Sequence, residues 1–270
     1  MTPAVYREYR PGPALRRHVA CYWTLDASPS PGHRVLPDGC MDLLFDLTGE
    51  EGPAVVGAMT TAIVTPPAPR AQLFGVRFLP GEAFGFVGVP SGLARDGVLS
   101  LGDVWGPVGR RIADRIGESR GTPARVAAIE EELLMVRRRG PDARVRHAVA
   151  RILATPAEAR VASLARDVGL GERQLERSFV ERVGLGPKAL ARVVRLQSLV
   201  ARLARGAAPR DRTPWAALAS DLGYADQAHL AREVKRLAGV TPTELAAEGP
   251  RPAIAVGDVG FVQGDAAAPA

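Results

Sequence analysis

The sequence predicts an α+β protein with an N-terminal β-rich barrel or sandwich domain, carrying helices, and a C-terminal all-α domain. Three observations lead to this prediction. Short apolar or alternating segments between Pro/Gly-rich breaks fill residues 1–100, apolar residues at helical spacing follow, and one stretch of the C-terminal region occurs twice. With 270 residues, 46% of them hydrophobic, the chain can bury two modest cores.

Four strands are expected within the predicted β-rich domain, residues 1–100. They are short apolar or alternating runs, at residues 19–25, 41–47, 54–58 and 72–79. Such a domain suits a sensor or a dimerisation module.

Residues 101–140 are expected to form a helical segment and linker. Helices are predicted at 104–116 and 123–138, and the second carries apolar residues at heptad spacing, namely Val126, Ile129, Leu133 and Val136. This stripe either packs on its own domain, which the short length favours, or contributes to a dimer. The break at 137–141 then marks the domain boundary.

The region 141–248 contains an internal repeat, in which residues 161–187 reappear as 215–242. Leu164 and Leu218 lie 54 positions apart, whereas Gly184 and Gly239 lie 55 apart, so the second copy has gained one residue. Each copy has a short apolar stripe, a glycine suited to a left-handed turn, and a second stripe at helical spacing. This pattern predicts two helix-turn-helix units.

The outward face of each second helix carries the candidate contacts to nucleic acid. Arg and Gln side chains can read guanine and adenine edges through paired hydrogen bonds. One copy alone would fit an amphipathic helix with a solvated charged face equally well, but outward arginines at matching positions in both copies favour DNA. The candidate residues are Glu172, Arg173, Glu176, Arg177, Gln227, Ala228, Ala231 and Arg232, with Asp226 as N-cap of the later helix.

The charge distribution agrees with this assignment. Residues 141–248 hold 18 Lys/Arg against 12 Asp/Glu, which accounts for the whole net charge of +6. Residues 1–140 are nearly neutral, and the tail, 249–270, is rich in Ala, Gly and Pro with one short apolar stretch at 253–262. Phosphate neutralisation requires such an excess on a DNA-binding domain.

Several short motifs within 144–245 resemble the DNA-binding domain of the AraC/XylS family of bacterial transcription regulators. The resemblance rests on Leu175-x-Arg177-x-Phe179, on Gly184-x-x-Pro187, and on Asp221-Leu-Gly-Tyr-x-Asp-Gln-x-His229-Leu-x-Arg232 followed by Gly239-Val-Thr-Pro242. The chain departs from the family at Gly171, where a Ser cap is usual, at Ala228, where Ser is common, and at Leu230 and Val234, where Phe is usual.

The resemblance implies two helix-turn-helix subdomains joined by a rigid helix, here about residues 188–205. Both recognition helices would face one side of double-stranded DNA and read two successive major-groove segments about 34 Å apart. It also implies RNA polymerase as a partner and a small-molecule effector bound by the N-terminal domain. We expect the protein in the cytoplasm, and a homodimer is one of the two assembly states considered, the other being a single chain that reads both segments. The alternatives are a constitutive DNA-binding protein whose N-terminal domain serves dimerisation or protein contact, and a cysteine-based sensor of alkylated DNA.

In the N-terminal region, the run Leu36-Pro-Asp-Gly-Cys-Met-Asp-Leu-Leu-Phe45 resembles an uncharacterised domain found fused to such DNA-binding domains. Alternation along the strand places Cys40, Asp42, Leu44 and Asp46 on one face. A ligand pocket could combine His33, Asp38, Cys40, Asp42 and Arg77. The favoured alternative is that Asp38 and Asp42 hydrogen-bond the turn amides.

Other functional classes find little support. The paired Cys and His spacings of structural zinc sites are absent, as are the motifs of nucleotide-binding loops, serine hydrolases and zinc proteases, so we expect no metal, no cofactor and no enzymatic activity. No apolar run approaches the roughly 20 residues that span a bilayer. Two cysteines are too few for a disulfide framework, in agreement with a cytosolic protein.

Overall fold

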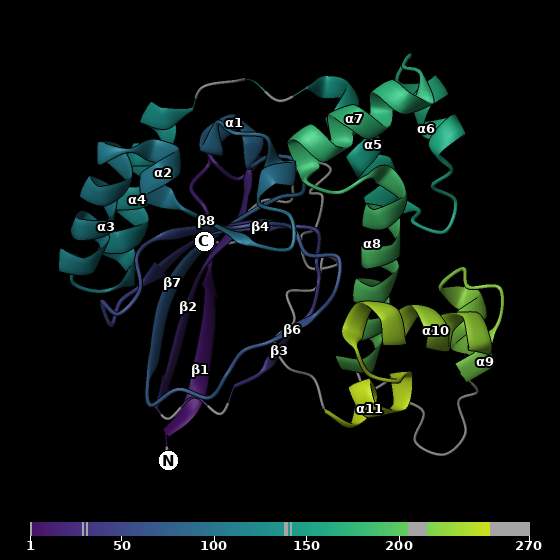
Figure 1. The fold of residues 1–270 in the computed structure, drawn as a ribbon, viewed down its shortest axis with the longest axis horizontal. Helices are drawn as coiled ribbons and strands as arrows, with labels where there is room; N and C mark the ends of the chain where they lie inside the picture. Colours follow the sequence, from purple (N-terminus) through teal and green to yellow (C-terminus); the bar gives the residue numbers. More distant parts are fainter. Residues whose placement is uncertain are drawn as a thin grey trace, which may run out of the picture.

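The computed structural model describes residues 2–28, 30, 32–137, 140, 142–204 and 215–248. It confirms the α+β class: an antiparallel sheet with helices forms the N-terminal part, and a helical domain follows (Figure 1). The predicted boundary at 137–141 and the tail 249–270, including its apolar stretch, lie largely or wholly outside the described residues. Among the described residues, no helix has the length and apolar character required to cross a bilayer.

The main sheet has six strands in the order β1-β2-β7-β4-β5-β8, and every neighbouring pair is antiparallel. A separate two-stranded antiparallel sheet pairs β3 with β6. The strands are β1 Thr2–Tyr9, β2 Val19–Ser28, β3 Arg34–Val35, β4 Met41–Asp46, β5 Ala54–Val56, β6 Ile63–Val64, β7 Ala71–Phe78 and β8 Val98–Ser100.

The register explains why the sheet has one apolar and one polar face. Directly paired residues share a face, and Tyr22, Val76, Leu43 and Val55 form one fully buried row across four strands. The neighbouring row, on the opposite face, contains Cys21, Arg77 and Asp42. The predicted alternation in β4 is thus present.

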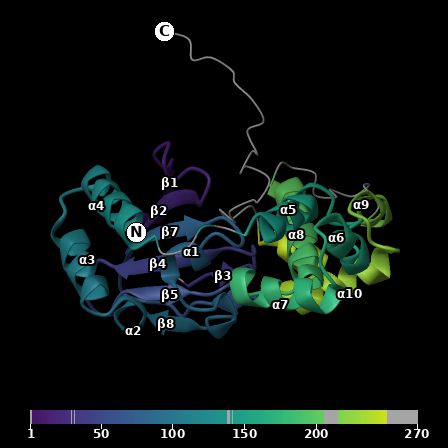
Figure 2. The same cartoon turned by 90° about the horizontal axis from the view of Figure 1, so that it is seen from above.

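Three helices cover the apolar face: α2 Leu101–Trp105, α3 Pro107–Glu118 and α4 Thr122–Val136. They lie on the side of the sheet away from the C-terminal domain (Figures 1 and 2). Ile129 and Leu133 of α4 are fully buried, and the Tyr22 hydroxyl donates to Glu130 Oε1 at 3.1 Å. The heptad-spaced stripe therefore packs on its own domain.

Two features of the β-rich part differ from the expectation. The sheet is open, because no pairing joins its end strands β1 and β8 in the part of the chain that the structure describes, so it is a helix-backed sheet rather than a closed barrel. The strands β1, β3, β6 and β8 were not predicted. The last three have only two or three residues, too few to show alternation.

The C-terminal domain consists of seven helices within the described residues: α5 Ala143–Ala154, α6 Val161–Asp167, α7 Glu172–Val183, α8 Pro187–Arg202, α9 Trp215–Asp221, α10 Gln227–Ala238 and α11 Pro242–Ala247. Helix α8 is the predicted linking helix. It carries apolar residues on most of its circumference, because both helix-turn-helix units pack against it. The expected end at residue 205 lies outside the described residues.

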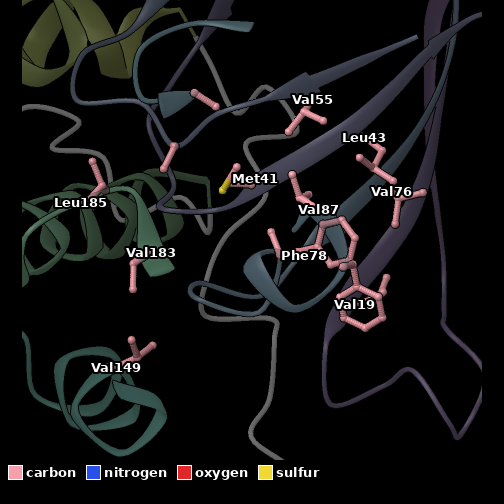
Figure 3. Packing of buried hydrophobic residues seen from close by; sticks show 14 of the residues in the cluster. Val19, Met41, Leu43, Val55, Val76, Phe78, Val87, Val149, Val183 and Leu185 are labelled. Atoms are coloured by element: carbon pink, nitrogen blue, oxygen red, sulfur yellow. The ribbon is translucent and has the colours of Figure 1, made fainter. Parts of the chain in front are cut away.

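Two hydrophobic cores hold the molecule together, but their border differs from the predicted domain border. The larger core runs from the sheet through α5, α6 and α7 into the first half of α8. Figure 3 shows Val149, Val183 and Leu185 of the helical domain on one side and Met41 and Val87 on the other. The smaller core joins the second half of α8 to α9, α10 and α11. The first helix-turn-helix unit is thus continuous with the N-terminal domain.

Candidate nucleic-acid interface

The first helix-turn-helix unit is formed by α6 and α7. Gly169 adopts a φ of +65° in the turn, with open space where a side chain would point. Leu175 and Phe179 of α7 are fully buried, which fixes the rotation of the helix about its axis. Gly171, at the N-cap, has extended backbone angles and makes no side-chain cap.

The second unit, α9 and α10, repeats this geometry. Gly223 adopts a φ of +72° in the turn, and Leu230 and Val234 are fully buried. The predicted N-cap is confirmed, because Asp226 Oδ1 accepts the His229 N–H at 2.6 Å. The His229 ring packs edge-on against Tyr224 and accepts the Ala225 N–H through Nδ1 at 3.2 Å, so it stabilises the turn.

The two recognition helices lie at opposite ends of α8 and on the same side of it (Figures 1 and 2). Seven of the eight candidate DNA contacts are exposed on α7 and α10: Glu172, Arg173, Glu176, Arg177, Gln227, Ala228 and Arg232. The eighth, Ala231, is half-buried on the flank of α10. These residues therefore lie where a major groove could reach them, and their contacts to DNA remain a prediction.

The three arginines of this surface are exposed on α7 and α10. Among the described residues, no hydrogen bond or ion pair engages the side chains of Arg173, Arg177 or Arg232. By contrast, Arg192 and Arg202, on the linking helix, form ion pairs with Glu233 and Asp221. Cations without a partner in the folded chain are available to phosphates or bases.

A cleft of about 720 Å³ lies beside α7, where the N-terminal domain approaches it. One wall is the segment 90–93, which includes the short helix η1 Ser91–Leu93. The other wall is α7 from Arg173 to Glu181. The cleft is open to solvent, so the outward face of α7 is not sealed by the N-terminal domain.

Four of the five residues of the candidate ligand pocket come together on the polar face of the sheet. Arg77 donates from Nε and Nη2 to the two carboxylate oxygens of Asp42, at 2.9 and 2.8 Å, and its Nε lies 3.5 Å from Asp38 Oδ2. Asp38 Oδ1 accepts the Cys40 N–H at 2.9 Å, as the turn-capping alternative predicts for Asp38, whereas Asp42 bonds Arg77 and Trp23 and no turn amide among the described residues. His33 instead bonds Thr65, and both residues flank the two-stranded β3–β6 sheet.

This cluster is buried but not fully satisfied. Trp23 Nε1 also donates to Asp42, at 3.2 Å, whereas Arg77 Nη1 is buried without a hydrogen-bond partner. Burial raises the pKa of Asp42, and the neighbouring guanidinium opposes that shift. The arrangement is an internal ion-pair network, and its role as a ligand pocket remains a prediction.

The cysteines do not have the environment of a reactive nucleophile. Burial raises the pKa of the Cys21 thiol to about 12, and it raises that of Cys40 well above the usual value. An activated thiol needs the opposite shift. No cluster of three or more metal-ligating side chains occurs in the part of the chain that the structure describes.

Sequence reasoning missed the residues that join the two domains. Arg146 of α5 makes two hydrogen bonds with Glu82, at 2.8 and 2.9 Å, and His18 contacts the same carboxylate at 2.6 Å. Gln197 of α8 donates to the Pro37 carbonyl at 2.7 Å. These contacts join residues that are far apart in the sequence. Because the residues form no local sequence motif, the sequence does not predict the contacts.

Family models cover both parts of the chain. Residues 164–248 match the model described as "Helix-turn-helix domain", and residues 7–100 match "Domain of unknown function (DUF6597)". The C-terminal region therefore belongs to the helix-turn-helix class of DNA-binding domains. More specifically, it is a helix-turn-helix domain of the AraC type, preceded by an N-terminal DUF6597 domain.

No curated protein matches the chain. Among solved structures, it is similar to ToxT from Vibrio cholerae O395, with 9% identity and a TM-score of 0.43 over 84% of this chain and 97% of that chain. It is also similar to unsaturated fatty acid bound ToxT from Vibrio cholerae strain SCE256, with 10% identity and a TM-score of 0.37 over 90% of this chain and 94% of that chain.

Proposed function

We propose that this protein is a sequence-specific transcription regulator that binds double-stranded DNA through two successive major-groove segments. Helix α7 would read one segment with Arg173, Glu176 and Arg177, and α10 would read the next with Gln227 and Arg232. Other basic residues would fix the register on phosphates. Ala228 and Ala231 would contribute apolar contacts, such as those made to thymine methyl groups.

The observation that carries this proposal is the pair Arg177 and Arg232. They occupy equivalent positions of the repeat, 55 residues apart, and each is exposed on a recognition helix. Neither has a partner among the described residues, although twelve other arginine or histidine side chains form ion pairs there. An exposed, unpaired arginine by itself also fits a solvated helix face, but the matching position of the two in both copies of the repeat favours contact with DNA.

The regulatory input is proposed to enter through the N-terminal domain, as a small-molecule effector. What supports this is the continuity of the larger core, because a change in the sheet would reach the first helix-turn-helix unit through direct packing. The effector must bind two arrangements of the domains with unequal affinity, since otherwise it would shift nothing. A constitutive DNA-binding protein, in which the N-terminal domain makes only structural contacts, is the alternative.

Selection from a random duplex library with the purified full-length protein tests the DNA-binding proposal. We expect enriched sites with two conserved blocks about 10 base pairs apart, and footprints over two neighbouring major-groove segments on one face of the duplex. A library that shows no enrichment, or a single conserved block, would contradict it.

The partners need separate measurements. Transcription from a promoter carrying the selected site, with purified RNA polymerase, tests the expected interaction with the polymerase. Sedimentation of the protein with and without the selected duplex tests the expected homodimer. For the effector, a metabolite panel is screened for compounds that change the affinity for the selected site, and a complete absence of such compounds would favour the constitutive alternative.

A further inference from the structure

We infer that the N-terminal domain acts as a clamp that positions the two recognition helices relative to each other, by holding the C-terminal turn of each. The clamp consists of η1, which contacts α7, and the two-stranded β3–β6 sheet with the residue before β6, which contacts α10. This inference rests on the proposed function for its purpose. The contacts themselves are independent of it.

At α7, the clamp is a close approach of backbones. Ser91 Oγ donates to the Arg182 carbonyl at 2.9 Å. A Cβ atom at Gly92 would lie 3.0 Å from both the Val180 carbonyl oxygen and its Cγ1 atom, so only a residue without a side chain fits there undisturbed. The segment thus touches the last turn of α7 directly.

At α10, the clamp is a set of hydrogen bonds to the same part of the helix. The Ala62 N–H donates to the Leu237 carbonyl at 2.7 Å, and Arg34 Nη1 donates to the Ala238 carbonyl at 2.9 Å. Arg34 is also paired through Nη2 with Glu248, which follows α11, at 3.2 Å. Both groups come from the N-terminal domain.

The two contact sites of the clamp, on α7 and on α10, are equivalent in the repeat. Arg182 and Leu237 lie 55 positions apart, the offset that also relates Gly184 to Gly239. The last carbonyls of a helix have no partner within the helix, so they are free to accept such bonds. One domain therefore holds the same carbonyl in both copies of a duplicated unit.

The clamp contacts leave the N-terminal ends of α7 and α10 uncovered. Recognition helices contact bases mainly with their N-terminal residues, and Arg173 and Gln227, near the starts of α7 and α10, are exposed. The open cleft between η1 and α7 leaves space beside the reading face. The clamp can therefore remain in place while DNA is bound, and it lowers the conformational cost of engaging both groove segments at once.

The test compares the full-length protein with the Arg34→Ala/Ser91→Ala double variant. Spin labels on cysteines introduced at the exposed positions Gln174 and Lys235 report the distance between α7 and α10 by pulsed electron resonance. We expect a narrow distance distribution in the parent protein and a distribution about twofold wider in the double variant. Arg202→Ala is the matched control, because it removes the ion pair with Asp221 and leaves the clamp intact.

The second readout is DNA affinity, measured without labels on a selected two-segment duplex and on a duplex that keeps one segment. We expect the double variant to lose about tenfold on the two-segment duplex and nothing on the single segment. Unchanged distance distributions, or equal losses on both duplexes, would overturn the inference. Tighter binding by the variant would also overturn it, because the domain would then restrain DNA binding.

The two proposals can fail separately. If no duplex is bound, the proposed function fails, and the distance distributions still decide whether the clamp exists. If the double variant loses its helical circular dichroism, Arg34→Ala alone replaces it, with Glu248→Gln as the variant that removes only the ion pair. A wider distribution in Arg34→Ala than in Glu248→Gln then supports the grip on Ala238, and equal widths contradict it.

Discussion

Gly75 and Trp23 lie directly opposite each other on strands β7 and β2, and the indole ring fills the space that a side chain at position 75 would need. A Cβ atom there would lie 2.0 Å from Trp23 Cε2. Trp23 in turn donates from Nε1 to Asp42. The glycine thus allows the indole to lie flat over the sheet and reach the ion-pair network.

We therefore expect Gly75→Ala to lower the free energy of unfolding by about 3 kcal/mol, since the methyl group must displace the ring or the strand. Chemical denaturation measures the loss. Gly52→Ala is the control, because a Cβ at Gly52 meets nothing within 4 Å. Equal stability of the two variants would show that the sheet adjusts without strain.

The junction carboxylate Glu82 predicts a dependence on acid. Burial alone would raise the pKa of Glu82, but hydrogen bonds from His18 and Arg146 outweigh it and hold the pKa below its usual value. A carboxyl whose pKa is lowered on folding stabilises the fold wherever it is ionised, above its unfolded pKa of about 4.3. This stability is lost as the pH falls through that value toward the folded pKa.

Accordingly, Glu82→Gln should lower the free energy of unfolding by about 2 kcal/mol at neutral pH and by less at pH 3. Thermal unfolding at both values measures the difference. Glu50→Gln, at an exposed position, provides the control. The same loss at both pH values would mean that the charge of Glu82 contributes nothing.

Removal of either matched arginine should weaken binding to the selected DNA site. We expect Arg177→Ala and Arg232→Ala each to cost about 1 to 3 kcal/mol and to relax base preference at one position, in a different groove segment for each variant. Competition binding with single-base variants of the site measures this. An equal loss on random DNA would indicate contact with the backbone only.

The buried thiols should be unreactive in the folded protein. Because burial raises the pKa of both Cys21 and Cys40, we expect alkylation by iodoacetamide at pH 8 to be at least about tenfold slower than in denaturant. Mass spectrometry of the folded and denatured protein measures both sites. Rapid modification of Cys40 in the folded protein, or a mass gain from methylated DNA, would restore the cysteine-based alternative.

A substitution at the N-cap of α7 should stabilise the fold. Gly171 has an extended backbone, no side-chain cap and open space at its Cβ position. Gly171→Ser should therefore raise the free energy of unfolding by a few tenths of a kcal/mol, about 0.3, by accepting a free N–H of the first turn. Gly171→Ala supplies the control without a hydroxyl, and it should not be more stable than Gly171→Ser.

The sequence by itself determined the duplicated helix-turn-helix units, the N-cap Asp226 and the inward residues of α7 and α10. It could do so because helical periodicity, turn glycines and caps are local signals. It also placed Asp42 and Cys40 on one face of a strand, because alternation is local too.

Only the tertiary structure decided how these parts meet. Three features depend on residues that are far apart in the chain. They are the strand order of the open sheet, the core shared by the N-terminal domain and the first helix-turn-helix unit, and the hydrogen bond from Arg34 to the Ala238 carbonyl. Their formation depends on the three-dimensional packing of whole helices and strands. A backbone carbonyl acceptor occurs in every residue, so the residue type does not identify which carbonyl will be bound. Such contacts leave no trace in the order of side chains.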